Sequence, residues 1–323
     1  MAVENISEHA ERAASLESMA EKVANSAARL PQIEDGTPEQ VRAFRADRGN
    51  PFAPEGCDLA AIADLDIPIG RGSVRARCYT PHTEALGDAP CLVFFHGGGY
   101  VLSTVEEYDT VTQQLAFHSG CKVISVDYEL APANKIKSIH HDGFDAYCWI
   151  REHAADLGID AQRIAVGGDS AGGNLTVAIT LLCKRENYPM PAFQLLIYPS
   201  VDPAMSFPSV DEFATGYFLT KNGMSWFRDH YLESPDQAND SELNFLQQDL
   251  AGLPPAWLMT AGFDPLRDEG KAYAEALERF SVPVTHICYT DMIHAFVSFA
   301  GGIKAGAAAL QRMGSVLRNA LAP

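Results

Sequence analysis

The chain has 323 residues, of which 47% are hydrophobic and 20% are charged, a composition typical of a soluble globular protein and not of a disordered chain. The formal net charge is −18, so DNA or an anionic membrane would be repelled, and we expect no nucleic-acid partner. No apolar run approaches the roughly 20 residues of a bilayer span, and residues 1–23 lack the apolar segment of a secretory signal.

The first predicted elements are helices in residues 1 to about 48. This stretch is rich in Ala, Glu and Arg, and Leu16, Met19 and Val23 fall at helical spacing. Two prolines, at positions 31 and 38, are expected to break the helical stretch into pieces. A link that contains proline and glycine follows at 50–56.

From residue 64 onward, candidate strands alternate with candidate helices, which predicts a mostly parallel sheet covered by helices on both faces. Residues 64–69 and 74–80 indicate a hairpin around Gly70 and Gly72. The further strand candidates are the apolar segments 91–95, 122–126, 163–167, 193–198, 256–261 and 284–289. The helix candidates are 105–119, 139–156, 171–185, 268–280 and 301–320.

The stretch from about 203 to 250 interrupts this alternation and is rich in aromatic residues. We expect it to be a cap that is inserted over the sheet. The predicted organisation is a single domain over 1–323, with a core of 64–202 and 251–323.

The seven cysteines are widely spaced, and none forms a C-x-x-C pair. This spacing argues against a disulfide framework and against a metal site. We therefore expect reduced thiols in a cytoplasmic protein. The cysteines are Cys57, Cys78, Cys91, Cys121, Cys148, Cys183 and Cys288.

The strongest motif lies in residues 163–182, where a strand runs into G-x-S-x-G and then into an apolar helix. Glycines two residues before and two residues after Ser170 leave room for a sharp turn. The helix that follows directs its N-terminus at the serine, which favours developing negative charge there. This context predicts that Ser170 is a catalytic nucleophile.

A second glycine-rich loop follows the buried strand of CLVFFHGGGY, residues 91–100. Acyl transfer requires backbone N–H donors for the oxyanion, and glycines let the main chain approach a substrate. No phosphate-loop pattern is present, and no lysine follows the glycines. We expect Gly98, Gly99 and Ala171 to donate to the oxyanion and His96 to shape the loop.

Position along the chain selects the acid and the base. An α/β hydrolase carries its nucleophile, acid and histidine in that order, each on a loop after a strand. Asp264 follows the strand candidate 256–261, and His294 follows the next one. Asp264 is predicted to hold the imidazole in the correct tautomer and to stabilise its cation.

Other acids and histidines are predicted to have different roles. Asp268 is expected to cap a helix that it starts, and Asp291 is too close in sequence to the base to orient it. His140 and His141, at a helix start, are expected to be solvated, whereas His286 is expected to be structural within a strand.

From about Pro68 to its end, the chain resembles the bacterial hormone-sensitive-lipase-like family of esterases. The motifs, in the family's order, are HGGGY, DYELAP (127–132), GGDSAGGN (167–174), GYFLT (216–220), LPPAWLMTAGFDPLRDEG (253–270) and MIHAF (292–296). The resemblance implies an α/β-hydrolase fold with an eight-stranded, mostly parallel sheet and a helical cap, which is built from 1–50 together with about 203–250. It also implies hydrolysis of short to medium acyl-chain esters without a cofactor, and the possibility of a homodimer.

The chain departs from the family pattern outside the three predicted catalytic positions. After DYELAP it reads ANKIKSIHHD (133–142), where the family has Glu and a proline-rich run. Ala295 stands where a glycine usually follows the catalytic histidine, and YTD precedes MIHAF where Y-P-G is common. We expect these departures to affect the local backbone conformation and the substrate preference.

Two alternative functions remain open at this point. A plant hormone receptor family shares the fold and many of the motifs, but it has lost the catalytic histidine, which is present here as His294. An amidase, arylformamidase or thioesterase would use the same triad, and the fold alone does not distinguish them.

Overall fold

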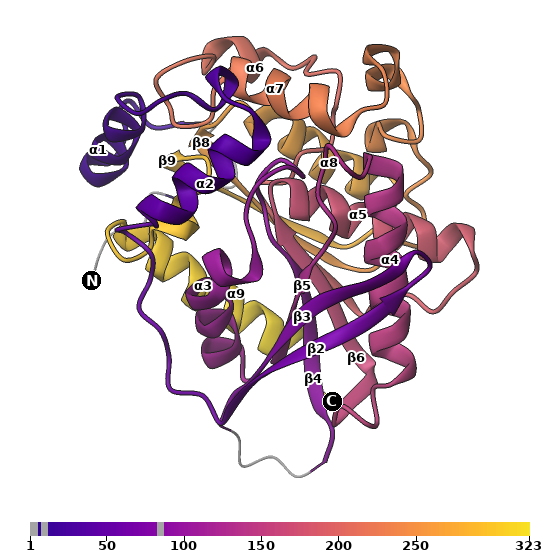
Figure 1. Ribbon diagram of the computed structural model, residues 1–323. Coiled ribbons are helices and arrows are strands. Elements are labelled where there is room, and N and C mark those ends of the chain that lie inside the picture. The colour runs from indigo at the N-terminus through magenta and orange to yellow at the C-terminus, as the bar shows by residue number, and fades with distance from the viewer. Residues whose placement is uncertain (1–5, 8–11, 83–86) are drawn as a thin grey trace.

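A single twisted sheet runs through the molecule in the order β1-β9-β8-β7-β6-β4-β5-β3-β2 (Figure 1). The computed structural model describes residues 6–7, 12–82 and 87–323. Strands β4 to β9 pair in parallel, whereas β2 and β3 are antiparallel. The predicted α/β-hydrolase fold with an eight-stranded, mostly parallel sheet is confirmed, and a two-residue strand, β1 (Ile6–Ser7), adds a short antiparallel edge to β9.

The strand predictions fall within strands of the structure, apart from the last residue of 193–198. The strands are β2 (Ala61–Ile69), β3 (Gly72–Thr80), β4 (Ala89–Phe95), β5 (Lys122–Asp127), β6 (Ile159–Asp169), β7 (Phe193–Ile197), β8 (Ala256–Phe263) and β9 (Val284–Ile293). The predicted hairpin is β2–β3. The sixth strand begins four residues earlier than predicted because Ile159 pairs with Ala89.

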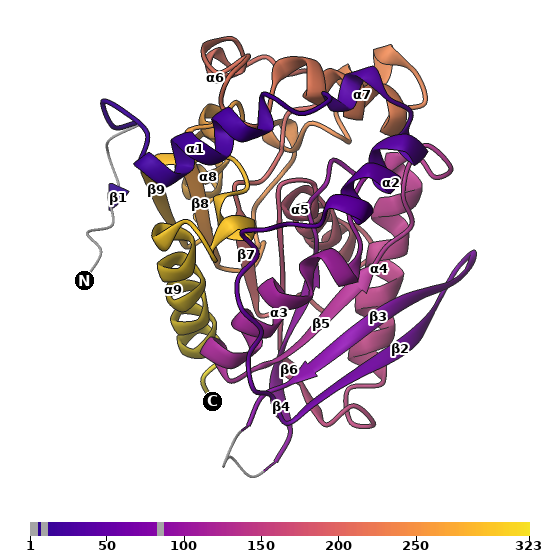
Figure 2. The ribbon, with the colours of Figure 1, turned by 60° about the vertical axis from the view of Figure 1, so that its left-hand side comes forward.

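Helices cover both faces of the sheet (Figure 2). They are α3 (Val105–Ser119), α4 (Ile136–Glu152), α5 (Ala171–Arg185), α8 (Arg267–Arg279) and α9 (Lys304–Ala320). Alternating residues of β4 face opposite sides: Leu92 and Phe94 share a buried cluster with α3 and α9, whereas Val93 and Phe95 share one with α4 and α5. None of the described helices combines the length and the apolar character needed to cross a bilayer.

A further layer, here called the upper layer, lies over the carboxyl edge of the sheet (Figure 2). Its helices are α1 (Ser18–Ala27), α2 (Pro38–Arg48), α6 (Pro208–Glu212) and α7 (Lys221–Tyr231). Pro38 begins α2, with a capping box between Thr37 and Gln40. The helical prediction for 1–48 is wrong for Ile6–Ser7, and part of it lies outside the described residues.

Short 3-10 turns complete the chain. They are η1 (Ile33–Asp35), η2 (Pro235–Asn239), η3 (Phe245–Gln247) and η4 (Phe296–Phe299). Helix α4 begins three residues before its predicted start and ends four residues before its predicted end. The early end reflects a run of turns after Glu152 that closes at Gly158, whose φ is +62°.

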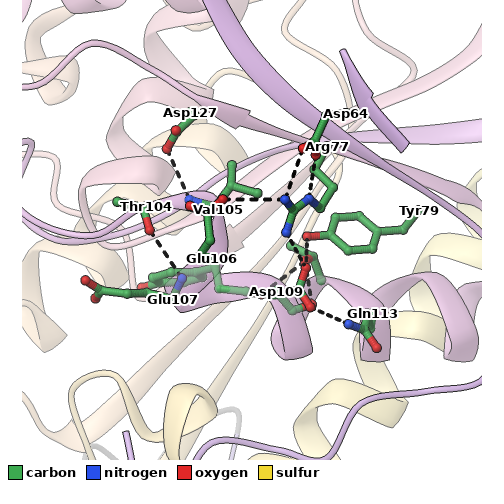
Figure 3. Close-up of polar contacts among 12 residues, drawn as sticks. Asp64, Arg77, Tyr79, Thr104, Val105, Glu106, Glu107, Asp109, Gln113 and Asp127 are labelled. Atoms are coloured by element: carbon green, nitrogen blue, oxygen red, sulfur yellow. Dashed lines mark hydrogen bonds and ion pairs between the residues drawn. The ribbon is translucent and has the colours of Figure 1, made fainter. Parts of the chain in front are cut away.

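An ion-pair network joins the β2–β3 hairpin to helix α3 (Figure 3). Arg77 donates to Asp64 at 2.6 Å and to Asp109 on α3 at 3.0 Å. Asp127, at the end of β5, accepts the N–H of Val105 at 3.1 Å. These contacts fix the start of α3, which directly follows the loop with the glycines of HGGGY.

Candidate active site

Ser170 lies at the sharp turn between β6 and α5. Its φ of 55° and ψ of −116° are unusual for a residue with a side chain. The turn is possible because glycines flank it: a Cβ on Gly172 would collide with the Phe95 carbonyl oxygen. The hydroxyl is thereby presented at the N-terminus of α5, as the G-x-S-x-G motif requires.

A hydrogen-bonded relay connects Ser170 to the two residues predicted as base and acid. His294 Nε2 lies 2.9 Å from Ser170 Oγ, and His294 Nδ1 lies 2.7 Å from Asp264 Oδ2. Asp264 is fully buried, and its Oδ1 accepts the N–H of Leu266 at 2.8 Å. With the Nδ1 proton directed at Asp264, Nε2 is free to accept a proton from the serine hydroxyl.

The rival acid Asp268 is engaged elsewhere. Its Oδ2 accepts the N–H of Ser209 at 2.9 Å, and its Oδ1 accepts Arg267 Nε at 2.7 Å. Helix α8 begins one residue earlier, at Arg267, after a Leu266 N-cap. The prediction that Asp268 caps its own helix is therefore wrong, because its carboxylate instead binds the start of α6.

Three of the remaining histidines differ in their surroundings. His286 lies within β9 as expected, with Nε2 3.0 Å from Thr260 Oγ1. The prediction that His140 is solvated is wrong, whereas His141 is exposed. Because α4 begins at Ile136, His140 lies in its second turn, where burial lowers its pKa to about 4.

The buried His140 belongs to a polar cluster with Tyr100 and Asn174, two residues that border the same cavity as Ser170. Its Nε2 lies 3.0 Å from Asn174 Oδ1, and Tyr100 donates its hydroxyl to the same oxygen at 2.6 Å. Asn174 in turn donates to the Ser200 carbonyl at 2.8 Å. This cluster connects the HGGGY loop, α4 and α5.

His96 shapes the glycine-rich loop from within. Its ring is fully buried, and Nδ1 lies 2.7 Å from the Gly97 carbonyl oxygen. Burial lowers the pKa of His96, so the neutral ring donates from Nδ1 to that oxygen. Tyr128 donates its hydroxyl to the His96 carbonyl at 2.7 Å, which holds the loop from the other side.

Gly98 and Gly99 have φ values of 110° and 61°, a backbone conformation that residues with side chains rarely adopt. A Cβ on Gly98 would collide with the Leu102 carbonyl. Gly99 and Ala171, the first residue of α5, border the same cavity as Ser170. The three predicted oxyanion donors therefore lie in the glycine-rich loop and at the start of α5, the two segments that meet at Ser170.

The cavity beside Ser170 has a volume of about 60 Å³. Its apolar lining includes Ile136, Met205, Leu219, Met224, Phe227, Leu243 and Leu266. Phe227, from α7, packs so closely on Gly99 that a Cβ there would collide with the ring. Neither His294 nor Asp264 borders this cavity. The cavity can therefore hold an apolar group beside Ser170, with His294 outside its lining.

Comparison with known proteins identifies the family. A family model described as alpha/beta hydrolase fold matches residues 92–298, which is more than half of the chain. The chain belongs to the hormone-sensitive-lipase-like α/β-hydrolase family of carboxylesterases. The predicted resemblance is confirmed.

Three similar proteins illustrate the match. Carboxylic ester hydrolase LipN of Mycobacterium tuberculosis is 38% identical over 76% of this chain and 67% of its own length. Ethyl acetate hydrolase of Pseudomonas putida is 35% identical over 80% of this chain and 78% of its own. The structure of ester-hydrolase EH1AB1 from the Lake Arreo metagenome, complexed with a bipyridine phosphonate derivative, matches with a TM-score of 0.90 at 34% identity, covering 94% of this chain and 98% of its own.

The protein is thus a carboxylic ester hydrolase, as predicted. This finding favours the esterase interpretation over the non-catalytic receptor interpretation.

Asp169, the residue before Ser170 in this esterase, is a buried site residue that was not predicted from the sequence. Its carboxylate is buried and accepts the N–H of Gly97 at 2.7 Å and the hydroxyl of Tyr108 at 2.8 Å. Burial raises the pKa of Asp169 to about 6, and the hydrogen bonds from Tyr108 and Gly97, followed by the nearby His294, partly oppose that rise. The available signal was a charged residue at the end of an apolar strand.

Asp169→Asn is expected to stabilise the esterase and to lower its activity. The asparagine keeps an acceptor for Gly97 without a buried charge. The raised pKa means that the folded state binds this proton more tightly than the unfolded state, so the ionised carboxylate destabilises the fold above about pH 6. The variant should be more stable than wild type by roughly 1–3 kcal/mol at pH 8, with the difference shrinking towards pH 4.

Loss of a negative charge close to His294 should also lower kcat about tenfold, since that charge helps to stabilise the imidazolium. Thermal midpoints between pH 4 and pH 8, together with kcat at pH 8, test both statements. A variant that is less stable than wild type at pH 8 would contradict this account of Asp169.

The unusual segment 133–142 connects the core to the upper layer of the esterase. Lys135 Nζ donates to the His230 carbonyl at the end of α7, at 2.6 Å. Lys137 Nζ lies 2.7 Å from both Asp240 and Glu242. The two lysines that replace the family's proline-rich run therefore bind the stretch 203–250, and Ile136 between them lines the cavity.

The unusual Ala295 adopts φ of 62° and ψ of 15°, directly after His294. This left-handed conformation is the one that the family's usual glycine adopts freely. For alanine it is unfavourable by roughly 1–2 kcal/mol. The surroundings hold it, because the Ala295 carbonyl accepts the N–H of Ser298 at 2.9 Å.

Proposed function

We propose that this esterase hydrolyses esters of short to medium acyl chains through a Ser170–His294–Asp264 triad and an acyl-enzyme. The observation that carries the proposal is the continuous relay of 2.9 Å and 2.7 Å hydrogen bonds from Ser170 Oγ to the buried Asp264. His294 takes the serine proton as Oγ attacks the ester carbonyl, and Asp264 stabilises the imidazolium that forms.

The attack produces a tetrahedral oxyanion, which the N–H groups of Gly98, Gly99 and Ala171 stabilise. His294 then donates its proton to the alcohol oxygen, and the C–O bond breaks to leave an acyl group on Ser170. Water attacks the acyl carbon while His294 accepts its proton, and His294 then returns that proton to Ser170 Oγ as the acyl C–O bond breaks and the carboxylic acid leaves. Apart from the ester and water, each step uses only side chains and main-chain groups of the chain, and no cofactor is proposed.

The cavity beside Ser170 is assigned to the acyl chain. The leaving alcohol must lie near His294 to receive a proton, whereas the cavity is bordered by the oxyanion-loop residue Gly99 and not by His294. On the same measure of cavity volume, a group the size of a water molecule requires about 10–15 Å³. The 60 Å³ cavity therefore has room for about four to six such groups, which favours short chains.

The upper layer is proposed to act as a cap within a single domain. Its helix α7 supplies Met224, Phe227 and Tyr231 to the acyl cavity. The proposed cap comprises 1–50 and about 203–250. The cytoplasmic location and the possible homodimer remain predictions.

We expect kcat/KM for p-nitrophenyl esters to peak at about four carbons and to fall steeply by sixteen, because the cavity is small. Met224→Ala, which removes apolar atoms from its wall, should move the peak towards longer chains. A matched control is Met313→Ala, which truncates a buried methionine on α9. A wild-type peak at sixteen carbons, or an unchanged peak in the Met224 variant, would contradict the acyl assignment.

An aryl organophosphate should label Ser170 covalently at a stoichiometry near one. A serine hydroxyl that is hydrogen-bonded to a base reacts where ordinary serines do not. Peptide mass mapping locates the adduct, and Ser170→Ala is the control. Protection by a short-chain ester is expected, whereas an adduct on a cysteine or on another serine would show that the nucleophile is misassigned.

A further inference from the structure

Arg42, on helix α2, binds main-chain carbonyls of two core loops. Its Nε donates to the Val101 carbonyl at 2.8 Å, and its Nη2 donates to the Ala131 carbonyl at 2.6 Å. Val101 follows the HGGGY loop, Ala131 follows β5, and both residues are fully buried. A guanidinium presents its donors in a rigid planar fork, so one side chain can hold two carbonyls in a defined relation.

The first of these loops has a backbone that requires external support. Four of its residues have positive φ: Gly98 at 110°, Gly99 at 61°, Tyr100 at 64° and Ser103 at 76°. For residues with side chains, this conformation persists only where the surroundings hold it. The Ala131 N–H donates to the Tyr100 carbonyl at 2.8 Å. Arg42 completes this attachment, because it binds Ala131 and Val101 at the same time.

The position of Val101 determines the direction of the Gly99 N–H. The Gly98 carbonyl accepts the N–H groups of Val101 at 3.0 Å and of Leu102 at 2.8 Å. In a planar trans peptide the carbonyl and the next N–H point in opposite directions. The Gly99 N–H therefore points away from this turn, and Gly99 borders the cavity beside Ser170.

We propose that Arg42 is a positioning residue for the oxyanion hole, through which helix α2 holds the Gly98–Gly99 peptide in its productive orientation. The inference rests on the proposed triad mechanism. Loss of one oxyanion donor lowers kcat by about 10²–10³-fold, so a donor that is only loosened should lower it by roughly 30–300-fold. Arg42 does not line the acyl cavity, so KM should stay within about threefold.

The test compares wild type with Arg42→Met, Arg42→Lys and Arg45→Met in the full chain. Arg45 is the matched control because it lies on the same helix and anchors it to α3 through Glu107 at 2.8 Å, with a longer 3.4 Å contact to Ser103 Oγ. Active sites are first titrated with an aryl organophosphate, so that misfolded protein is not counted. The measured quantities are kcat and KM for p-nitrophenyl butyrate and the Ki of a short trifluoromethyl ketone, which forms an oxyanion on the serine.

Arg42→Met should lower kcat per titrated site by about 30–300-fold and raise the Ki by a similar factor. Arg42→Lys should lower kcat by about 3–30-fold, because an ammonium group lacks the planar fork. If Arg42→Met folds poorly, Arg42→Lys serves as the test, through the same two measurements of kcat per titrated site and Ki. Arg45→Met should stay within about threefold of wild type.

Two results would overturn the proposal: unchanged kcat per titrated site in the Arg42 variants, or an equal loss in the Arg45 control, which would indicate general docking of α2. A wild-type protein that neither turns over esters nor titrates would instead refute the proposed function.

Discussion

Ser170→Ala is expected to lower kcat for a short-chain ester by about 10⁴- to 10⁶-fold while the fold survives. The hydroxyl is the only group at this turn that can form the acyl-enzyme, and its removal leaves His294 without a proton to accept. The oxyanion loop and the acyl cavity remain, so a residual rate above that in water is expected. Stopped assays with p-nitrophenyl butyrate measure the loss.

The matched control is Ser315→Ala, on the exposed side of α9, whose hydroxyl donates only to the Gln311 carbonyl. It should retain wild-type kcat. Thermal melting should give nearly equal midpoints for all three proteins. Activity of the Ser170 variant within tenfold of wild type, in a preparation free of contaminating esterase, would mean that another residue is the nucleophile.

Asp264→Asn should lower kcat by roughly 10⁴-fold with little loss of stability. The asparagine oxygen can still accept the Leu266 N–H, but its amide then faces His294 Nδ1 as a donor. The imidazole proton moves to Nε2, so the ring meets Ser170 with a donor instead of an acceptor. Measurement of kcat and the thermal midpoint tests both halves of this prediction.

Asp268→Asn is the matched comparison, four residues along the chain. Its carboxylate accepts Ser209 N–H and pairs with Arg267, whose other nitrogen lies 2.9 Å from Glu212 on α6. The variant should lose stability by about 1–3 kcal/mol, because charged, partly buried hydrogen bonds are weakened. Its kcat should stay within tenfold of wild type. Catalytic loss in the Asp268 variant together with stability loss alone in the Asp264 variant would reverse the two assignments.

Much of this fold could be predicted from the sequence because the decisive signals are local. The strands of a sheet covered on both faces are continuous apolar runs, as in 91–95 and 256–261. The elbow at Ser170 requires nearby glycines within one short turn. Because parallel strands end at one edge of the sheet, residues that follow β6, β8 and β9 meet there once the strand order is known. Candidates for the triad could therefore be named without coordinates.

The remaining features depend on which surfaces pack together, and this is not visible in a short window of sequence. Helix α4 begins three residues earlier than predicted. His140 therefore lies in the polar cluster around Asn174 and not in solvent. Asp268 binds a segment that lies 59 residues away in the chain. Lys135 reaches the end of α7, 95 residues further on.

The oxyanion loop shows the same division between sequence and tertiary structure. Its glycines are evident in the sequence because only they tolerate the backbone at positions 98 and 99. The groups that hold the loop are Asp169, 72 residues from Gly97, and Arg42, 59 residues from Val101. The candidate residues of the site and their order along the chain follow from local patterns in the sequence. The groups that surround and orient these residues are apparent only in the folded molecule, because hydrogen bonds between distant segments form once the sheet and the upper layer have packed together.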